Sequence, residues 1–325
     1  MTKSLARSLV ILAALLAAPL VGSNAARAQQ PAPPTKVVWG YTNPSSYYWD
    51  VYAAIELGFL KQEGLDVEPI NIPTVGTALR TLLTGDLGIL SVNTEVAISA
   101  MEKEADIVLV GAETTKPTFA FVARPEFKTF TDLRGKTLGV TQLDEASTTM
   151  LKLLLQKHGV KSGEYDLVTT GGTPNRYAAL KTGAIAATML SQPVDFLAES
   201  EGMRILGHAF EVFDGPLVSI AVQNKWAKAN SDTLVSFLRA TVKGSRWLHD
   251  PANKQKAMSL LMAATKCTEY EARKSYEMFF GPLGIVSVDL ALNTTGVQKY
   301  LDLRGSKANP EKFLDMSYLQ RALGR

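Results

Sequence analysis

The sequence is poor in the side chains on which many enzymes and metalloproteins depend. It has one cysteine, Cys267, and three histidines, His158, His208 and His249, which are far apart in the chain. A single cysteine excludes an internal disulfide, and no spacing of cysteine and histidine matches a metal site. The motifs G-x-G-x-x-G, H-E-x-x-H and G-x-S-x-G do not occur. We therefore expect no catalysis, no metal and no cofactor.

Net charge is also small, and most of it belongs to the N-terminus. The formal net charge of the 325 residues is +3. Lys3, Arg7 and Arg27 lie in the first 28 residues, which contain no acid. The rest of the chain is close to neutral, and no basic patch predicts binding to nucleic acid.

Residues 1–28 have the pattern of a secretory signal peptide. A basic start precedes an apolar run from Leu9 to Val21, and Ala26-Arg27-Ala28 is a small-x-small cleavage site. The run is too short to span a bilayer, and no second long apolar run follows. Residues 29–35 contain three prolines and are expected to form a flexible leader. These features predict a periplasmic protein that is freed by cleavage of its signal peptide.

The remaining chain alternates short apolar strands with helices, which predicts an α/β fold with mostly parallel sheets flanked by helices. Strands are predicted at 37–39, 65–70, 87–90 and 107–110, and the same plan restarts at 137–141, 166–169, 186–190 and 203–206. From about Trp226 the sequence is mostly helical, with helices predicted at 233–249, 251–264 and 268–280. This repetition indicates two lobes of similar plan.

Two extended segments, 119–124 and 216–223, are expected to link the lobes as hinge strands. Lobe one is predicted to contain residues 36–121 and 218–325, and lobe two residues 122–217. The helical tail is expected to pack back on lobe one. Such a plan is typical of proteins that close on a ligand by a hinge motion.

Three phrases carry a family resemblance: AIELGFLKQEGLDVE, LLTGDLGILSVN and FTDLRGKTLGV. They resemble the nitrate/sulfonate/taurine branch of ABC-importer substrate-binding proteins, which also includes binders of thiamine precursors. The resemblance covers about Val37 to Gly207. It implies a type II-like periplasmic-binding-protein fold and a monomeric receptor that passes a small solute to an inner-membrane ABC permease. One departure is Gly183-Ala184-Ile185-Ala186, where the family often has Gly-x-Asp-Ala, and we interpret the missing acid as structural.

The loops that leave strand ends are rich in Ser, Thr, Asn and Gly, which cap helices and expose N–H groups. In open α/β sheets, ligands bind at these strand ends. In lobe one we predict ligand contacts from Tyr47, Tyr48, Trp49, Thr74, Gly76, Thr77, Ser91, Asn93 and Thr94. In lobe two we predict them from Gln142, Asp144, Ser147, Thr148, Gly172, Thr173, Asn175, Arg176, Ser191 and Gln192. The alternative for each uncharged polar residue is an ordinary helix cap, and the alternative for each ring is a place in the core. For Arg176 the alternative is a solvated surface arginine, and for Asp144 it is stabilisation of the helix dipole.

The charged loop residues do not decide whether the ligand is an acid or an amine. Arg176 begins a predicted helix and would pair with a sulfonate or carboxylate. Asp144 or Glu145 would instead hold an amine or a ring N–H, as in a heteroaromatic solute. The rings of Tyr47 and Tyr48 favour an organic solute over a bare inorganic ion.

Two other functions remain open at this level. Eukaryotic thiamine-pyrimidine synthases are similar to this family, but they are intracellular and carry a cysteine-rich iron-binding segment, unlike this chain. A sensory module that reports its solute to a membrane kinase would have the same sequence features as a transport receptor.

Overall fold

The structure is a computed structural model that describes residues 33–143 and 145–325. Residues 34–325 form one compact unit. The predicted signal peptide, residues 29–32 of the predicted leader, and Asp144 lie outside the described residues. Thr35, the last residue of the predicted leader, already belongs to strand β1, where its N–H donates to the Gly64 carbonyl at 2.8 Å.

The first sheet has five strands in the order β2-β1-β3-β10-β4. Their bounds are β1 (Thr35–Tyr41), β2 (Leu65–Asn71), β3 (Ile89–Asn93), β4 (Ile107–Ala112) and β10 (Val218–Gln223). Neighbours β2, β1 and β3 are parallel, whereas β10 is antiparallel to both β3 and β4. Both β4 and β10 are buried along their whole length, which agrees with their continuous apolar sequences.

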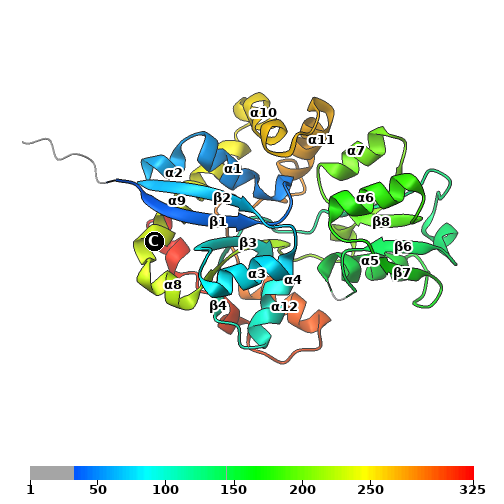
Figure 1. Ribbon diagram of the computed structural model, residues 1–325, viewed down its shortest axis with the longest axis horizontal. Coiled ribbons are helices and arrows are strands. Elements are labelled where there is room, and N and C mark those ends of the chain that lie inside the picture. The colour runs from blue at the N-terminus through cyan, green and yellow to red at the C-terminus, as the bar shows by residue number, and fades with distance from the viewer. Residues whose placement is uncertain (1–32, 144) are drawn as a thin grey trace, which may run out of the picture. The chain divides into compact units, whose positions relative to one another are not determined.

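The second sheet repeats this plan in the order β7-β6-β8-β5-β9. Its strands are β5 (Ala120–Ala123), β6 (Thr137–Val140), β7 (Asp166–Thr169), β8 (Ala187–Leu190) and β9 (Arg204–His208). Here β5 is the antiparallel strand, in the fourth place that β10 occupies in the first sheet. Figure 1 shows β1 to β4 in blue to cyan and the strands of the second sheet in green. The predicted two-lobed α/β fold is confirmed.

The chain passes between the sheets twice, in segments 113–119 and 209–217, which are paired at both ends. Ala209 N–H donates to the Phe119 carbonyl at 2.9 Å, and Glu113 N–H donates to the Val218 carbonyl at 3.0 Å. The extended segments predicted as hinges are therefore regular strands that follow each crossing. The predicted boundary between residues 121 and 122 falls inside β5, all of which pairs in the second sheet.

The helices follow the predicted alternation, with additions in the tail. In the first part of the chain they are α1 (Trp49–Glu56), α2 (Phe59–Gln62), α3 (Val75–Thr84) and α4 (Thr94–Glu102). Between β6 and β9 they are α5 (Ala146–Lys157), α6 (Thr173–Thr182) and α7 (Val194–Ser200). The tail contains α8 (Asn224–Ala229), α9 (Ser231–His249), α10 (Lys254–Thr265), α11 (Glu269–Phe279), α12 (Thr294–Leu303) and α13 (Ser317–Ala322).

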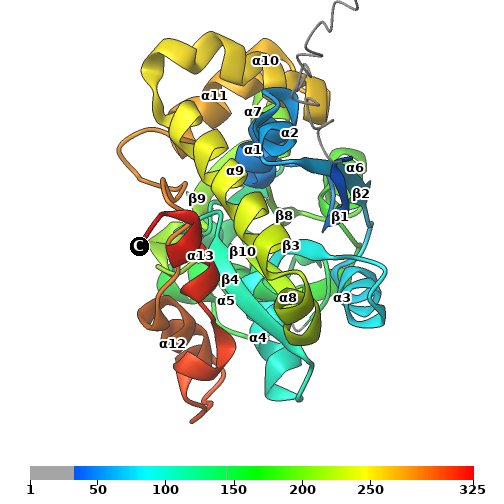
Figure 2. The ribbon, with the colours of Figure 1, turned by 90° about the vertical axis from the view of Figure 1, so that its left-hand side faces the viewer.

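The tail packs mainly on the first sheet through α9, which Figure 2 shows lying close to both α1 and α13. Gly244 makes the close approach to α1 possible, because a Cβ at this position would overlap the Asp50 carbonyl oxygen. Glu63, after α2, accepts from Arg239 and Lys243 of α9, each at 2.7 Å. The prediction that the tail packs on lobe one is therefore confirmed.

One tail helix, α11, also contacts the second lobe. The Tyr270 hydroxyl donates to Glu199 of α7 at 3.2 Å, and Lys274 forms an ion pair with the same carboxylate at 3.3 Å. These contacts are partly exposed and contribute little stability. Within the described ranges, no helix combines the length and hydrophobicity that a membrane crossing requires.

Candidate functional site

A cavity of about 390 Å³ lies where loops of the two sheets face each other. From the predicted set, the lining residues are Tyr47, Tyr48, Thr74, Gly76, Asn93, Gln142, Ser147, Gly172, Thr173, Arg176 and Ser191. The structure therefore brings predicted residues of both lobes to one space. All of them lie at or after the carboxyl end of a strand, where ligands bind in open α/β sheets.

Helix N-termini converge on this cavity. Thr74 caps α3 by accepting from the Thr77 N–H, and Asn93 caps α4 by accepting from the Glu95 N–H. Gly172 precedes α6, and Ser147 lies in the first turn of α5. Because the N-terminal end of a helix carries partial positive charge, this arrangement favours a negative group in the cavity.

Arg176 is the most constrained charged residue in the cavity wall, and it is only 2% exposed. Its Nε donates to the Met189 carbonyl at 3.0 Å, and Nη1 donates to the Gly171 carbonyl at 2.8 Å and to the Thr141 hydroxyl. Nη2 donates to the Thr173 hydroxyl at 3.2 Å. Each of these four acceptors is a neutral oxygen. Four of the five guanidinium N–H groups are thereby used.

The protonation of Arg176 is fixed by its surroundings. Burial lowers the pKa of Arg176 to about 10, while the nearby Glu145 and Tyr47 oppose this shift. The guanidinium therefore remains charged at neutral pH. Glu145 also lines the cavity, together with Glu95, Lys103 and Arg304.

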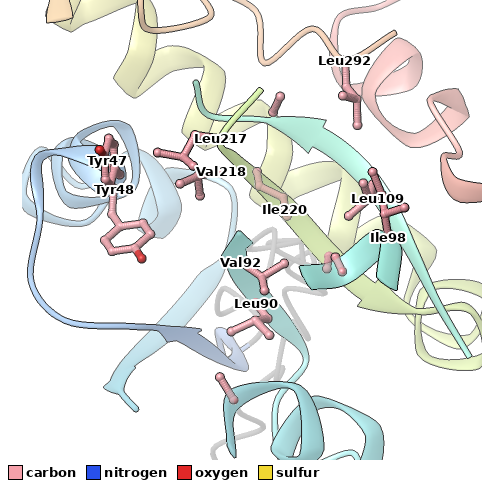
Figure 3. Close-up of a cluster of buried hydrophobic side chains, with 14 of the residues drawn as sticks. Tyr47, Tyr48, Leu90, Val92, Ile98, Leu109, Leu217, Val218, Ile220 and Leu292 are labelled. Carbon is pink, nitrogen blue, oxygen red and sulfur yellow. The ribbon is translucent and has the colours of Figure 1, made fainter. Parts of the chain in front are cut away.

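The two tyrosines line the cavity and are also part of the hydrophobic core. The Tyr47 ring packs against Phe119 and Phe279, with ring centroids 5.9 and 5.7 Å apart. Figure 3 shows Tyr47 and Tyr48 near Leu217 and Val218, which line the same cavity. Burial strongly raises the pKa of Tyr47 and raises that of Tyr48 to about 12, so both hydroxyls are neutral donors at neutral pH.

Trp49 does not line the cavity, contrary to prediction. It is 1% exposed, and its indole N–H donates to the Ala257 carbonyl at 3.1 Å. Its ring meets Tyr276 and Phe280 of the tail, with centroids 6.1 and 5.3 Å away. The first residue of α1 thus faces the tail helices, whereas the two tyrosines before it face the cavity.

Three predicted hydroxyls are buried in the scaffold behind the cavity wall. Ser91 lies within β3, which extends beyond the predicted strand, and its hydroxyl donates to Glu113 at 2.9 Å. The Thr94 hydroxyl is 2.8 Å from that of Ser219. The Thr148 hydroxyl donates to the Gln142 carbonyl at 2.6 Å. Each is used to hold neighbouring segments together.

Three further predicted residues lie outside the cavity lining for different reasons. The Thr77 hydroxyl accepts from Thr74 at 2.8 Å on the exposed side of α3. Asn175 is exposed, because α6 begins at Thr173 and carries it around the helix. Gln192 is fully buried and bonded to Thr118. Asp144, which also belongs to the predicted set, lies outside the described residues.

Sequence reasoning missed part of the lining. The missed residues are Thr42, Asn43, Ser45, Pro73, Val75, Leu79, Glu95, Val96, Ser99, Ala100, Lys103, Phe119, Thr141, Gly171, Leu217, Val218 and Arg304. Thr42 to Ser45 could have been found, because they directly follow β1. Phe119, Leu217 and Val218 lie in or beside the crossing segments, which pattern alone does not orient. In the described part of the chain, no three His, Cys, Asp or Glu side chains are grouped so that they could hold a metal ion.

The chain is similar to a known protein family and to named binding proteins. The profile of the NMT1/THI5-like family matches residues 45–254. A Bacillus subtilis protein named as a binding protein, YtlA, is 27% identical over 229 residues, covering 68% of both chains. A formylaminopyrimidine-binding protein of Halalkalibacterium halodurans is 25% identical over 235 residues, covering 67% of both chains.

Solved structures share the fold. The alkanesulfonate-binding protein SsuA of Xanthomonas axonopodis pv. citri, solved with bound MOPS, superposes with a TM-score of 0.71. The match covers 90% of this chain and 98% of that one, at 14% identity. This likeness establishes the periplasmic-binding-protein fold and leaves the ligand to be argued from the cavity itself.

Proposed function

The chain belongs to the NMT1/THI5-like family, and on that premise we propose that it is a periplasmic solute-binding receptor. Its solute is a small organic acid, which it captures between its two lobes and delivers to an ABC permease in the inner membrane. The binding-protein names of its relatives and the signal-peptide pattern of residues 1–28 support this role. The single observation that carries the ligand class is the buried, charged Arg176 in the cavity wall.

The cavity wall mixes polar and apolar groups. The second lobe contributes Arg176 with the hydroxyls of Thr173 and Ser191, and it also contributes the N-terminal ends of α5 and α6. The first lobe and the crossings contribute rings and aliphatic groups, among them Tyr47 and Leu217, alongside charged side chains of both signs. A ligand that matches Arg176 and these apolar groups has an acidic group attached to an aromatic or aliphatic body.

Size also favours an organic ligand over an inorganic ion. A volume of about 390 Å³ lies within the range of small-molecule pockets. A nitrate-sized ion would leave most of the cavity wall without contact. The ligand favours closure through the contacts that it makes to both lobes at once, because only a ligand that binds the closed form better shifts the equilibrium. The proposed role involves no catalytic step, and Cys267 does not line the cavity.

The experiment that tests this proposal compares acids with neutral molecules of the same shape. Protein stripped of ligand by unfolding and refolding is titrated calorimetrically with benzoate and benzamide, benzenesulfonate and benzenesulfonamide, and formylaminopyrimidine. We expect the acids to bind more tightly than their amides. Arg176→Met should weaken acid binding by about 10- to 100-fold, the value of a charged hydrogen bond, and change amide binding little.

Arg304→Met is the matched control. Arg304 also lines the cavity, but its guanidinium is engaged by Glu102 at 2.9 Å, so we expect a smaller effect on acid binding. Circular dichroism melting of both variants shows whether the lost bonds of Arg176 to Met189 and Gly171 have loosened the fold. Equal binding of acids and amides, or preferred binding of the pyrimidine, contradicts the proposed ligand class.

A further inference from the structure

The carboxamide of Gln192 has every hydrogen-bonding position filled. Its Nε2 donates to the Thr118 carbonyl at 2.8 Å and to Asp195 Oδ2 at 2.7 Å. Its Oε1 accepts from the Thr118 hydroxyl at 2.6 Å and from the Tyr47 hydroxyl at 3.3 Å. The Thr118 hydroxyl also lies 3.0 Å from that of Tyr47. An amide has two donors and two acceptor lone pairs, so this orientation is fully specified.

The partners of Gln192 come from three separate parts of the fold. Tyr47 precedes α1 in the first lobe, Asp195 lies in α7 of the second, and Thr118 lies in the crossing segment 113–119. The main chain of Gln192 adds two further bonds across the lobes. Its carbonyl accepts from the Ser45 hydroxyl at 3.0 Å and from the Ser46 N–H at 3.2 Å.

The network is buried, and its centre lies behind the cavity wall. Gln192, Thr118 and Asp195 are 0% exposed and do not line the cavity, whereas Ser45 and Tyr47 do. Burial strengthens such a network, because a partner left unpaired there would be costly. The three residues behind the wall therefore hold Ser45 and Tyr47 in place without touching the cavity.

We propose that Ser45, Tyr47, Thr118, Gln192 and Asp195 form an interlobe latch that is independent of the ligand, with Gln192 as its positioning residue. The latch stabilises the closed arrangement of the lobes and seats Tyr47 in the cavity wall. The effect of the latch on ligand affinity rests on the proposed receptor function. Apparent affinity scales with the fraction of molecules that are competent to bind, so the latch raises affinity for every ligand by one common factor.

Thr118→Val tests the latch with little change of shape. Valine keeps the volume and removes the hydroxyl that reaches both Gln192 and Tyr47. Thr188→Val is the matched control, because the Thr188 hydroxyl is equally buried but donates within the second sheet, to the Gly139 carbonyl at 2.8 Å. Ser45→Ala is a second latch variant that removes one bond to the Gln192 carbonyl.

The first readout needs no ligand. Spin labels are placed by Glu68→Cys on β2 and Asp166→Cys on β7, both exposed, in a Cys267→Ser background. Pulsed EPR then measures the distance between the lobes in the full mature protein. We expect a short-distance population in the otherwise wild-type protein. The ratio of short to long distances should fall about tenfold in Thr118→Val and stay unchanged in Thr188→Val.

The second readout is binding of benzoate and benzenesulfonate. We expect Thr118→Val to weaken both by one common factor, equal to the loss of closed molecules that the EPR ratio reports, unlike Arg176→Met, which discriminates between acid and amide. The latch is overturned if the reference protein shows no short distances, if Thr118→Val matches Thr188→Val, or if the affinity loss differs between ligands. If no probe binds but the EPR ratio shifts as expected, the latch holds and the proposed ligand class fails.

Discussion

Tyr48 belongs to two regions of the protein at once. Its ring packs with Trp39, Tyr41 and Tyr52, with centroids 6.1, 5.4 and 6.3 Å away, and the residue also lines the cavity. Its hydroxyl donates to the Thr42 carbonyl at 3.1 Å. Deleting the whole ring would remove core packing worth about 3–5 kcal/mol, so it cannot isolate a contact with the ligand.

A hydroxyl deletion is the sharper test at this residue. Tyr48→Phe should lower the free energy of unfolding by about 1 kcal/mol and weaken acid binding, because Thr42 in the cavity wall loses its anchor. Tyr300→Phe is the control, since its buried hydroxyl donates to the Pro216 carbonyl at 2.7 Å away from the cavity. Urea unfolding and calorimetric titration measure the two quantities. If the two variants bind acids equally well, the Tyr48 hydroxyl does not shape the site.

At the residue scale, the sequence predicted positions along the chain better than directions of side chains. Asn93 and Thr94 are adjacent strand-end residues, yet only Asn93 lines the cavity, while Thr94 is bonded to Ser219 from a distant strand. That partner follows the second crossing, so no local pattern could reveal it. Tyr47 and Trp49 are likewise two residues apart in the sequence, yet only Tyr47 lines the cavity.

Two helical glycines differ in how closely atoms of other segments approach them. Gly244 in α9 lies against the Asp50 carbonyl of α1, whereas Gly76 in α3 has no atom nearer to an added Cβ than Arg80 Nη1 at 3.7 Å. Both glycines are helical, so the intrinsic preference of helices for alanine applies to both. Only the packing differs.

The same substitution should therefore have opposite effects at these two sites. Gly76→Ala should stabilise the protein by up to about 1 kcal/mol, as helix propensity dictates. Gly244→Ala should destabilise it by about 1–3 kcal/mol, because the two helices must separate. Chemical denaturation at equilibrium measures both. A stabilising Gly244→Ala would show that α9 can move away from α1 without loss.

At the element scale, the alternation of strands and helices was enough to predict the order of elements but not the sense of every strand. The segments that form β5 and β10 were predicted as links, because each is an extended segment that leaves a predicted lobe. Each instead completes the middle of a sheet in an antiparallel sense. Hydrogen bonding to strands far away in sequence decides this, and one sequence does not report it.

Two buried carboxyl groups make the stability of the whole molecule depend on pH. Burial raises the pKa of Asp50 to about 7, and burial raises the pKa of Glu113 well above its usual value, with nearby Asp50 adding to the effect. An acid whose pKa is raised by folding binds more protons when folded. The contribution of Asp50 to the free energy of unfolding is thus largest below about pH 4, and it is lost as the pH rises through about 7.

Asp50→Asn should make this dependence less steep, while buried Glu113 and Asp195, whose pKa values burial also raises, keep part of it. The amide oxygen can still accept from the Val51 N–H, which donates to Asp50 Oδ1 at 2.8 Å, and the ionisable group is gone. Between about pH 4 and 7, the wild-type free energy of unfolding should fall by up to about 1.4 kcal/mol per pH unit more steeply than that of the variant. Urea unfolding across this range tests it, with exposed Asp66→Asn as control. Parallel curves for Asp50→Asn and wild type would contradict the assignment.

For the whole molecule, two lobes with a site between them could be predicted because the βα pattern restarts at about residue 131. The ligand class could not be predicted from the sequence, because it depends on which charged side chain is buried in the cavity wall. Arg176 looked like a possible surface arginine in the sequence. Its buried guanidinium is held by four oxygen acceptors, which come from strand β8, the loop after β6 and the segment that enters α6.

The place of β10 between β3 and β4 has a consequence for how the protein is made. Chains are synthesised from the N-terminus, so β3 and β4 leave the ribosome more than a hundred residues before the strand that must join them. Until residues 218–223 emerge, β4 has no hydrogen-bonded neighbour in the first sheet, and one edge of β3 is unpaired. For the proposed exported receptor, this delay would leave the first sheet incomplete until most of the chain has been made.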